Sequence, residues 1–303
     1  MKKVDISFIT INYNSSGFTI ELIKSIKRHT SLSYEIIVVD NASEKEDLQT
    51  LEEFVLKEKS IKLLKNRINA GFASGNMLGV NAASGEYYFF INNDTQLLND
   101  AGAILKQYLD THENVALATA KVSDENGRYT STHKIFPSVT KELFGNSVAR
   151  MFNKFPSNKT KLETPTTVEV VSGSCMFFRA SVFCRIGGFD TIFFLYCEEE
   201  DIAKRVWLAG YEVCFLPEAK IIHHSGGSTQ KSLAILKEYY ISYKHLIFKH
   251  FDLPRANLLM LLVTLKLLRR SFKSKRAIHL LLFALRGFPK KESLRYEQKV
   301  SEC

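Results

Sequence analysis

Short apolar segments alternate with helix-like segments through the first third of the chain, and this alternation constrains the fold more than any other feature. Strand-like runs lie at 4–12, 34–40, 61–64 and 87–91, with helix-like segments between them. Strands that are joined through a helix pair in parallel, and the helices cover the faces of the sheet. The sequence therefore predicts an α/β fold with a mostly parallel central sheet flanked by helices.

Polar side chains follow each of these predicted strands where the strand ends. They are Asn12, Asp40, Asn69, Asn92, Asn93 and Asp94. The carboxyl ends of parallel strands meet at one edge of the sheet, which is where open α/β sheets bind ligands. For Asp94 alone, turn formation and capping of a helix that begins near Asn99 is the commoner explanation. Polar residues at four successive strand ends favour a binding site.

Several classes of protein are excluded by missing motifs. No Gly-x-Gly-x-x-Gly opens the first helix and no Gly-Lys-Ser/Thr loop occurs, which argues against dinucleotide and P-loop sites. Five cysteines without a Cys-x-x-Cys pair argue against a disulfide framework and a zinc ribbon, and favour a reducing compartment. The N-terminus lacks the pattern of a signal peptide, so we expect a cytoplasmic protein.

The second half of the chain predicts further strands and two polar clusters. Strand patterns lie at 115–122, 168–178, 213–217 and 219–224, and a helix is expected at 99–112. Gly173 interrupts one strand, as at a bulge or a close ligand approach. An apolar aromatic run leads into Glu198, Glu199, Glu200 and Asp201 at the start of a helix. The helix dipole favours acids there, but carboxylates that follow a buried segment also suit a general base with a raised pKa.

The segment 231–303 is basic and rich in leucine. It holds 16 Lys and Arg against 5 Asp and Glu, a net charge of +11 within a chain of +9. Its apolar runs are too short to span a bilayer, and their interleaved basic residues predict helices that lie on an anionic membrane surface. The alternative is a helical hairpin that packs on the body or on a second subunit as a homodimer. Nucleic acid is not an expected partner, because the leucines would stay exposed.

Seven short blocks occur in a characteristic order at 10–14, 39–43, 69–73, 91–94, 172–175, 196–201 and 223–228. In this order the chain resembles the family 2 glycosyltransferases, specifically the bacterial branch similar to rhamnosyltransferases that build O-antigen and related polysaccharides. The resemblance covers roughly residues 4–250. It implies the GT-A fold, with a glycosyltransferase domain at 1–230 and a helical tail at 231–303. Within the domain, 1–98 would bind the nucleotide and 99–230 the acceptor.

The resemblance also implies roles for individual residues. The nucleotide-sugar contacts would come from Asn12, Asp40, Asn69, Gly71, Asn76, Asn93 and Gly173. Asp94 matches the last acid of the family's metal-binding triplet, and His223 matches a histidine that completes the Mg²⁺ or Mn²⁺ site. Many relatives carry two acids in this triplet, whereas this chain carries one, so the donor diphosphate would have to supply further ligands.

The implied activity is transfer of a sugar with inversion at its anomeric carbon. Glu199, with Glu198 and Asp201 beside it, matches the acidic block that supplies the family's base. The donor would be a dTDP- or UDP-sugar and the acceptor a lipid-linked glycan at the cytoplasmic face of the inner membrane, where the protein would be peripheral. The alternative is a catalytically inactive sugar-nucleotide-binding or assembly protein. A nucleotidyltransferase would need a basic, glycine-rich phosphate loop near the N-terminus, which is missing.

Overall fold

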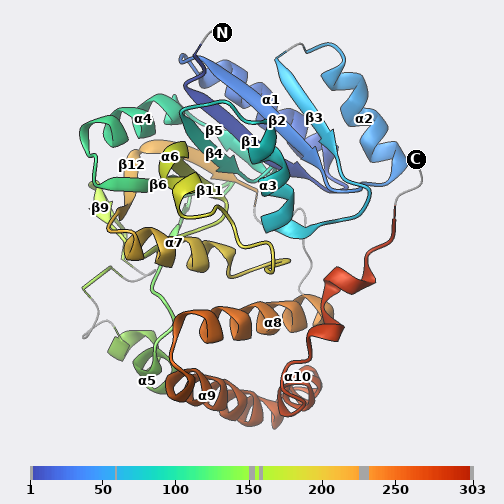
Figure 1. The fold of residues 1–303 in the computed structure, drawn as a ribbon, viewed down its shortest axis with the longest axis vertical. Helices are drawn as coiled ribbons and strands as arrows, with labels where there is room; N and C mark the ends of the chain where they lie inside the picture. The colour runs from blue at the N-terminus through green and yellow to red at the C-terminus, as the bar shows by residue number, and fades with distance from the viewer. Residues whose placement is uncertain (1–2, 59, 150–153, 157–159, 225–231, 301–303) are drawn as a thin grey trace.

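The computed structural model describes residues 3–58, 60–149, 154–156, 160–224 and 232–300, and its N-terminal part is the predicted parallel sheet (Figure 1). The elements are β1 (Ile6–Asn12), α1 (Ser16–His29), β2 (Tyr34–Asp40), α2 (Lys45–Val55), β3 (Ile61–Lys65), α3 (Gly71–Ala82) and β4 (Tyr87–Ile91). The strands lie in the order β3-β2-β1-β4, all parallel. Ile6 pairs with Tyr34 on one side and Tyr87 on the other, so the polar strand ends lie at one edge.

The second half of the chain extends this sheet and makes it mixed. Its elements are β5 (Thr95–Leu97), α4 (Ala101–Thr111), β6 (Val115–Ser123), β7 (Tyr129–Thr130), β8 (His133–Lys134), α5 (Val139–Ala149), β9 (Thr166–Thr167), β10 (Val170–Val171), β11 (Cys175–Arg179), α6 (Ala180–Arg185), α7 (Glu198–Leu208) and β12 (Glu212–His223). The sheet continues as β4-β11-β6-β12-β5, with β11 antiparallel to both of its neighbours. Strands β8 and β10 form a separate two-stranded sheet.

The structure differs from the predicted elements in three places. No strand was predicted between 91 and the helix expected at 99, but residues 95–97 form β5, which pairs antiparallel with the end of β12. The strand predicted at 168–178, with an interruption at Gly173, is two strands, β10 and β11, because the chain leaves the small sheet at Ser172 to join the main one. The two strands expected at 213–217 and 219–224 are one long strand, β12.

The aromatic strand β4 lies at the centre of the sheet and packs on both faces. Tyr87 and Phe89 belong to the apolar cluster under α1, α2 and α4, whereas Tyr88 and Phe90 belong to the cluster under α3, α6 and α7. Phe90 is fully buried, with its ring centroid 4.9 Å from that of Phe189. Alternate side chains of a strand point to opposite faces, which explains why every residue of this run is apolar.

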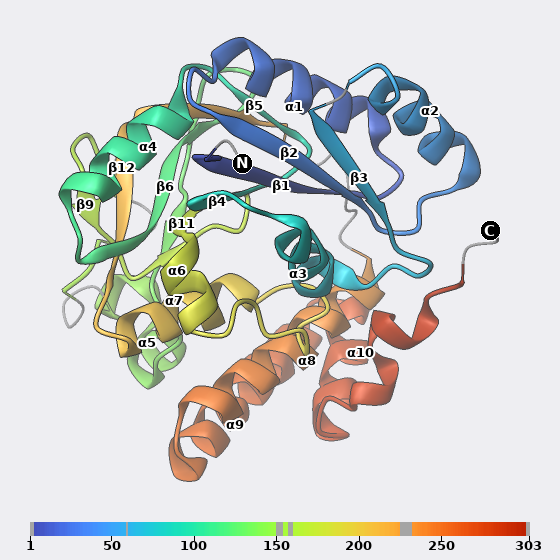
Figure 2. The same ribbon diagram turned by 45° about the horizontal axis from the view of Figure 1, so that its top comes forward.

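Three helices form the tail, and they lie in a layer beside α7 (Figures 1 and 2). They are α8 (Leu233–His250), α9 (Leu253–Ser271) and α10 (Lys275–Leu285), followed by short 3-10 turns at Lys290–Glu292 and Leu294–Glu297. Leu246 and Ile247 of α8 join the same apolar cluster as Phe193 and Ile202. The tail thus shares a core with the preceding half of the chain. Searched over its described residues, the chain has no helix with the length and apolarity needed to cross a bilayer.

Candidate active site

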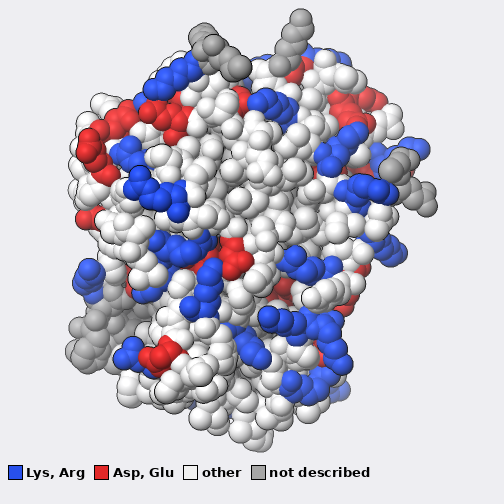
Figure 3. All heavy atoms as spheres, viewed as in Figure 1, with Lys and Arg blue, Asp and Glu red and all other residues white. Residues whose placement is uncertain are grey.

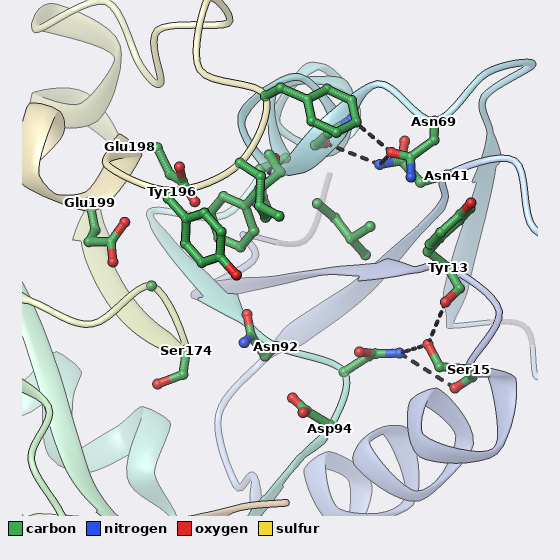
Figure 4. Close-up of a pocket in the computed structure, with 18 of the residues that line it drawn as sticks. Tyr13, Ser15, Asn41, Asn69, Asn92, Asp94, Ser174, Tyr196, Glu198 and Glu199 are labelled. Carbon is green, nitrogen blue, oxygen red and sulfur yellow. Dashed lines mark hydrogen bonds between the residues drawn. The ribbon is translucent and has the colours of Figure 1, made fainter. Parts of the chain in front are cut away.

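A cavity of about 500 Å³ opens at the carboxyl ends of β1, β2 and β4 (Figure 4). One side is lined by Tyr13, Ser15, Asn41, Asn69, Gly71 and Asn76, and the base by Asn92, Asn93 and Asp94. The opposite side is lined by Ser172, Gly173, Ser174, Phe194, Tyr196, Glu198 and Glu199, His223 joins Asp94 at the base, and the tail adds Ile235, Leu294 and Gln298. The predicted site residues therefore line one cavity, except for Asn12, Asp40 and Asp201.

Asn12 and Asp40 hold neighbouring strand ends together. The Asn12 amide donates hydrogen bonds to Asp40 Oδ1 and to Asp47 Oδ2, each at 2.9 Å, and both Asn12 and Asp40 are buried. These bonds fix the loops that follow β1 and β2. The residues of those loops that reach the cavity are Tyr13 and Asn41. A direct contact of Asn12 or Asp40 with a nucleotide stays a prediction.

Asn69 and Gly71 belong to a hydrogen-bonded loop that is fastened to the far side of the cavity. The Asn41 amide donates to Asn69 Oδ1 and to the Gly71 carbonyl, both at 3.1 Å. Gly71 has a φ of +78°, and a Cβ there would lie 2.2 Å from the carbonyl oxygen of Phe194. The Phe72 N–H donates to that same oxygen at 2.8 Å. Only glycine can be accommodated at position 71, because the backbone there lies so close to Phe194. This contact joins the N-terminal loop to the segment before α7.

Asn76 and Asn93 have their side chains fixed by internal bonds at the cavity surface. The Asn93 amide donates to Ser15 Oγ at 2.7 Å, and the Asn76 amide donates to the Phe72 carbonyl at 3.1 Å. Gly173 lies between β10 and β11, where a Cβ would meet only the Phe72 ring at 3.7 Å. Packing does not require glycine there, and a ligand contact at Gly173 stays a prediction.

Asp94 and His223 are in direct contact at the base of the cavity. Asp94 Oδ1 lies 3.0 Å from His223 Nε2, and both side chains are largely buried. The contact depends on the unpredicted strand β5, because Thr95 pairs with His223 and the His224 N–H donates to the Asp94 carbonyl at 2.8 Å.

This pair fits a divalent cation. A carboxylate and an imidazole that lie side by side are ligands that suit Mn²⁺, and in the structure the two groups form an ion pair at 3.0 Å. No group of three His, Cys, Asp or Glu side chains suited to a metal occurs among the residues described. The protein would supply two ligands and the diphosphate the others, as the single acid in the triplet predicts.

The carboxylates of Glu198 and Glu199 reach the cavity from the first turn of α7. Tyr196 and Cys197, just before them, have left-handed φ values of 70° and 69°, a conformation that is strained for such residues. Glu198 is 5% exposed, and its Oε2 has no hydrogen-bond partner among the described residues. Lys134 of β8 lies behind them and pairs with Glu199 Oε1 at 2.6 Å.

The adjacent carboxyls of Glu198 and Glu199 have pKa values displaced in opposite directions. Burial, reinforced by the negative charge of Glu199, raises the pKa of Glu198 well above its usual range. Burial acts on Glu199 in the same sense, but the Lys134 ammonium outweighs it and holds the pKa of Glu199 below its usual value. Glu199 is therefore the more acidic member of the pair, and Glu198 keeps its proton to higher pH than Glu199 does. An ionised carboxylate at a cavity surface can accept a proton from a bound hydroxyl group.

Asp201 lies behind the cavity and ties α7 to α8. Its side chain is fully buried, and its oxygens contact Arg205 at 2.7 Å, Lys249 at 2.7 Å and His250 at 2.8 Å. Burial alone would raise its pKa, but the bond from His250 and the charges of Arg205 and Lys249 lower it to about 2. A catalytic role for Asp201 stays a prediction, and its contacts are those of a structural ion cluster.

Sequence reasoning missed several contributors to the site, among them Asn41, Tyr13, Tyr196, Lys134 and Gln298. Tyr13 and Tyr196 fall inside two of the matched blocks, so the sequence contained a signal for both. Lys134 lies in a strand of two residues, and Gln298 follows a short 3-10 turn near the end of the chain. Neither has a local pattern that marks it.

Comparisons with known proteins show the family of the chain. The model of the family described as "Glycosyl transferase family 2" matches residues 7–187. The rhamnosyltransferase WbbL of Escherichia coli is 25% identical over 201 residues, which are 63% of this chain and 73% of that protein. The N-acetylglucosaminyl-diphospho-decaprenol L-rhamnosyltransferase of Mycobacterium tuberculosis is 39% identical over 64 residues, about a fifth of each chain.

Solved structures share the fold at low sequence identity. The mannosyltransferase PcManGT from Pyrobaculum calidifontis, in complex with GDP-Man and Mn²⁺, has a TM-score of 0.58 at 14% identity and covers 96% of this chain and 83% of its own. GalNAc-T7 with UDP, GalNAc and Mn²⁺ has a TM-score of 0.59 at 17% identity, over 80% of this chain and 48% of its own. With a family model matched over more than half of its length, the chain belongs to glycosyl transferase family 2.

Proposed function

We propose that this glycosyltransferase is an inverting, metal-dependent enzyme. In this proposal it moves a sugar, with rhamnose as the first candidate, from a dTDP- or UDP-sugar to a lipid-linked glycan in cell-surface polysaccharide synthesis. The observation that carries the proposal is the arrangement of the cavity in Figure 4: Asp94 lies at its base, and Glu198 and Glu199 lie to one side across an open space. Direct displacement needs a cation at the leaving group and a base at the attacking hydroxyl.

Asp94 and His223 are the proposed holders of Mg²⁺ or Mn²⁺. When bound, such an ion stabilises negative charge on a departing diphosphate. Support comes from the 3.0 Å separation of their ligating atoms and from Mn²⁺ in the two structural relatives. The nucleotide sugar would lie beside Asp94 and His223. It would contact further residues that line the same cavity, namely Asn69, Gly71, Asn76, Asn93 and Gly173.

Glu199 is the proposed base. Its carboxylate would take the proton of the acceptor hydroxyl as that oxygen attacks the anomeric carbon and the bond to the diphosphate oxygen breaks. The ion pair of Glu199 with Lys134 supports this choice over Glu198, because it lowers the pKa of Glu199 while burial raises the pKa of Glu198. A neutral Glu198 could donate a hydrogen bond to the acceptor and thereby orient it.

A lipid-linked acceptor is supported by the relatives and by α9. The name of the mycobacterial relative gives a diphospho-decaprenol acceptor. Leu259, Val263 and Leu267 form the buried stripe of α9. A second stripe, spaced by three and four residues, faces outward and consists of Leu258, Leu261, Leu265, Leu268 and Phe272, which are 41–82% exposed.

Basic residues accompany this outward stripe. Arg269 and Arg270 lie between its last two members, Leu268 and Phe272, and Lys273, Lys275 and Arg276 follow it. Blue Lys and Arg atoms cover more of the lower part of the face in Figure 3 than red Asp and Glu atoms do. An apolar stripe with adjoining cations fits an anionic membrane surface at the cytoplasmic face, where the enzyme would be peripheral. A second copy of the chain on this stripe is the competing occupant, and sedimentation of the protein without lipid distinguishes the two.

The donor can be identified by thermal stabilisation. Purified protein with Mn²⁺ is heated in the presence of dTDP-rhamnose, other dTDP-sugars and UDP-sugars. The true donor at 100 times its Kd should stabilise the fold by about 3 kcal/mol. Transfer from that donor to N-acetylglucosaminyl-diphospho-polyprenol is then followed by mass spectrometry. Stabilisation without transfer or hydrolysis would indicate the inactive alternative, and no stabilisation by any sugar nucleotide would refute the proposal.

A further inference from the structure

The small sheet of β8 and β10 brings a lysine behind the carboxylates of α7. Val170 of β10 pairs with Lys134 of β8, and β10 leads directly into Ser172, at the cavity surface. Lys134 does not line the cavity itself, and its side chain is two-fifths exposed. Its Nζ lies 2.6 Å from Glu199 Oε1 and 3.3 Å from Glu200 Oε1. One cation thus contacts two of three consecutive carboxyls.

Among the groups around Glu199, Lys134 lowers the pKa of its carboxyl most. Glu199 lies between two other carboxyls of α7, those of Glu198 and Glu200. The titratable groups that surround this cluster are Tyr196 and Cys197 before α7, Lys134 of β8, Lys141 of α5 and Tyr239 of α8. Burial raises the pKa of Cys197 and of both tyrosines, so all three are neutral at pH 7. The Lys141 ammonium donates to the Ile135 carbonyl at 2.9 Å and not to these carboxyls.

Without Lys134, three adjacent carboxyls would compete for protons in a poorly solvated space. Such groups do not all ionise at neutral pH, and a buried carboxyl without a counter-ion takes up a proton. Glu198 Oε2 and Glu200 Oε2 are buried and have no hydrogen-bond partner among the described residues, which marks both neighbours as poorly solvated acids. The direct ion pair singles out Glu199 as the member that keeps its charge.

We propose that Lys134 is a positioning residue that selects Glu199 as the ionised member of the Glu198–Glu199–Glu200 cluster and holds its carboxylate ready to accept the acceptor proton. This inference rests on the proposed function for its catalytic consequence, but the charge of Glu199 can be measured independently of activity. The two-stranded sheet of β8 and β10 would then position two parts of the site together, because β8 carries Lys134 and β10 leads into the Ser172–Ser174 edge of the cavity.

The test compares wild type with Lys134→Met, Lys134→Arg and the control Lys204→Met. Lys204 lies on the same helix α7, with its ammonium over the Phe136 ring. Protein labelled with ¹³C at the glutamate carboxyl carbons is titrated by NMR, and Glu199→Gln identifies the Glu199 signal. In Lys134→Met the midpoint of that signal should rise by about one to three pH units. Lys134→Arg and Lys204→Met should leave it near the wild-type position.

Activity gives the second readout. The acidic limb of the kcat/KM profile should move to higher pH in Lys134→Met, activity should recover toward the wild-type level near pH 9, and Lys134→Arg should restore the wild-type profile. An unmoved Glu199 midpoint in folded Lys134→Met overturns the inference, as does a uniform activity loss that high pH does not relieve. If Lys134→Met does not fold, the same NMR titration of Lys134→Gln decides. Absence of transferase activity in wild type refutes the proposed function instead, since the titration does not depend on it.

Discussion

Replacing Asp201 by Asn should destabilise the protein in a pH-dependent way. The carboxylate is fully buried and contacts Arg205, Lys249 and His250. Its pKa is lowered from 3.8 to about 2, which corresponds to about 2 kcal/mol of unfolding free energy at neutral pH. Asparagine also leaves three basic side chains without their acid, so we expect a loss of about 3 kcal/mol at pH 7.

The sign of the pH dependence follows from the lowered pKa. The contribution of Asp201 is fully present above pH 3.8 and is lost as the pH falls through about 2. The stability difference between wild type and Asp201→Asn should therefore shrink on acidification, and about half of the charge contribution should remain at pH 3.

Urea unfolding at pH 7 and pH 3 measures this difference. The single tryptophan, Trp207, lies in α7 and reports unfolding by its fluorescence. The matched control is Asp252→Asn, because Asp252 caps α9 with a side chain that is 54% exposed and Asn is an equally good N-cap. A loss below about 0.5 kcal/mol at pH 7 in Asp201→Asn, or a difference that does not change with pH, would refute the reasoning.

Three further predictions concern the reaction and the tail. Glu199→Gln should lower kcat by about 10²–10⁴-fold with donor binding unchanged, whereas Glu198→Gln should change mainly the acceptor KM. If steady-state kinetics show the large loss of kcat in Glu198→Gln and not in Glu199→Gln, Glu198 is the base. Asp94→Asn should weaken Mn²⁺-dependent binding of nucleoside diphosphate in calorimetry, and unchanged affinity would remove Asp94 from the metal site. Arg269→Glu with Arg270→Glu should reduce sedimentation with anionic liposomes, and high salt should reduce binding of the wild type; equal sedimentation would contradict the membrane surface.

Charge reversal is a better test of the tail than deletion of 256–303. Ala256, Leu259, Val263 and Leu267 are buried against the rest of the protein. Removing them would expose the core and change membrane binding for reasons unrelated to the outward stripe. Arg269 and Arg270 are exposed, so their reversal leaves the core intact.

The parallel half of the fold could be predicted because its signals are local. Each strand from β1 to β4 is an apolar run that ends in polar residues, and the turns and helices between them leave few ways to connect the strands. The Asn41 to Gly71 network, in contrast, joins residues from separate loops. Sequence reasoning found Asn69 and Gly71 through their block but not the side chain of Asn41 that holds them.

The parts that could not be predicted depend on short or distant pairings. Strand β5 has three residues and exists through its pairing with β12, so nothing near Thr95 marks it as a strand. Lys134 lies in a strand of two residues for the same reason. The burial of Asn12 and Asp201 could not be predicted either. A residue's type does not show whether its polar side chain contacts a ligand or an internal hydrogen-bond partner.

The pairing of β5 with β12 also has a consequence for synthesis of the protein. Asp94 is translated with the N-terminal half, but His223 arrives only at the end of β12. A nascent chain in which β1 to β4 have left the ribosome already has the strands and loops on one side of the cavity, yet it lacks the second ligand of the proposed cation site. Since contacts distant in sequence form late, binding of the ion would follow docking of β12. The proposed cation site would thus be complete only after the second half of the domain has folded.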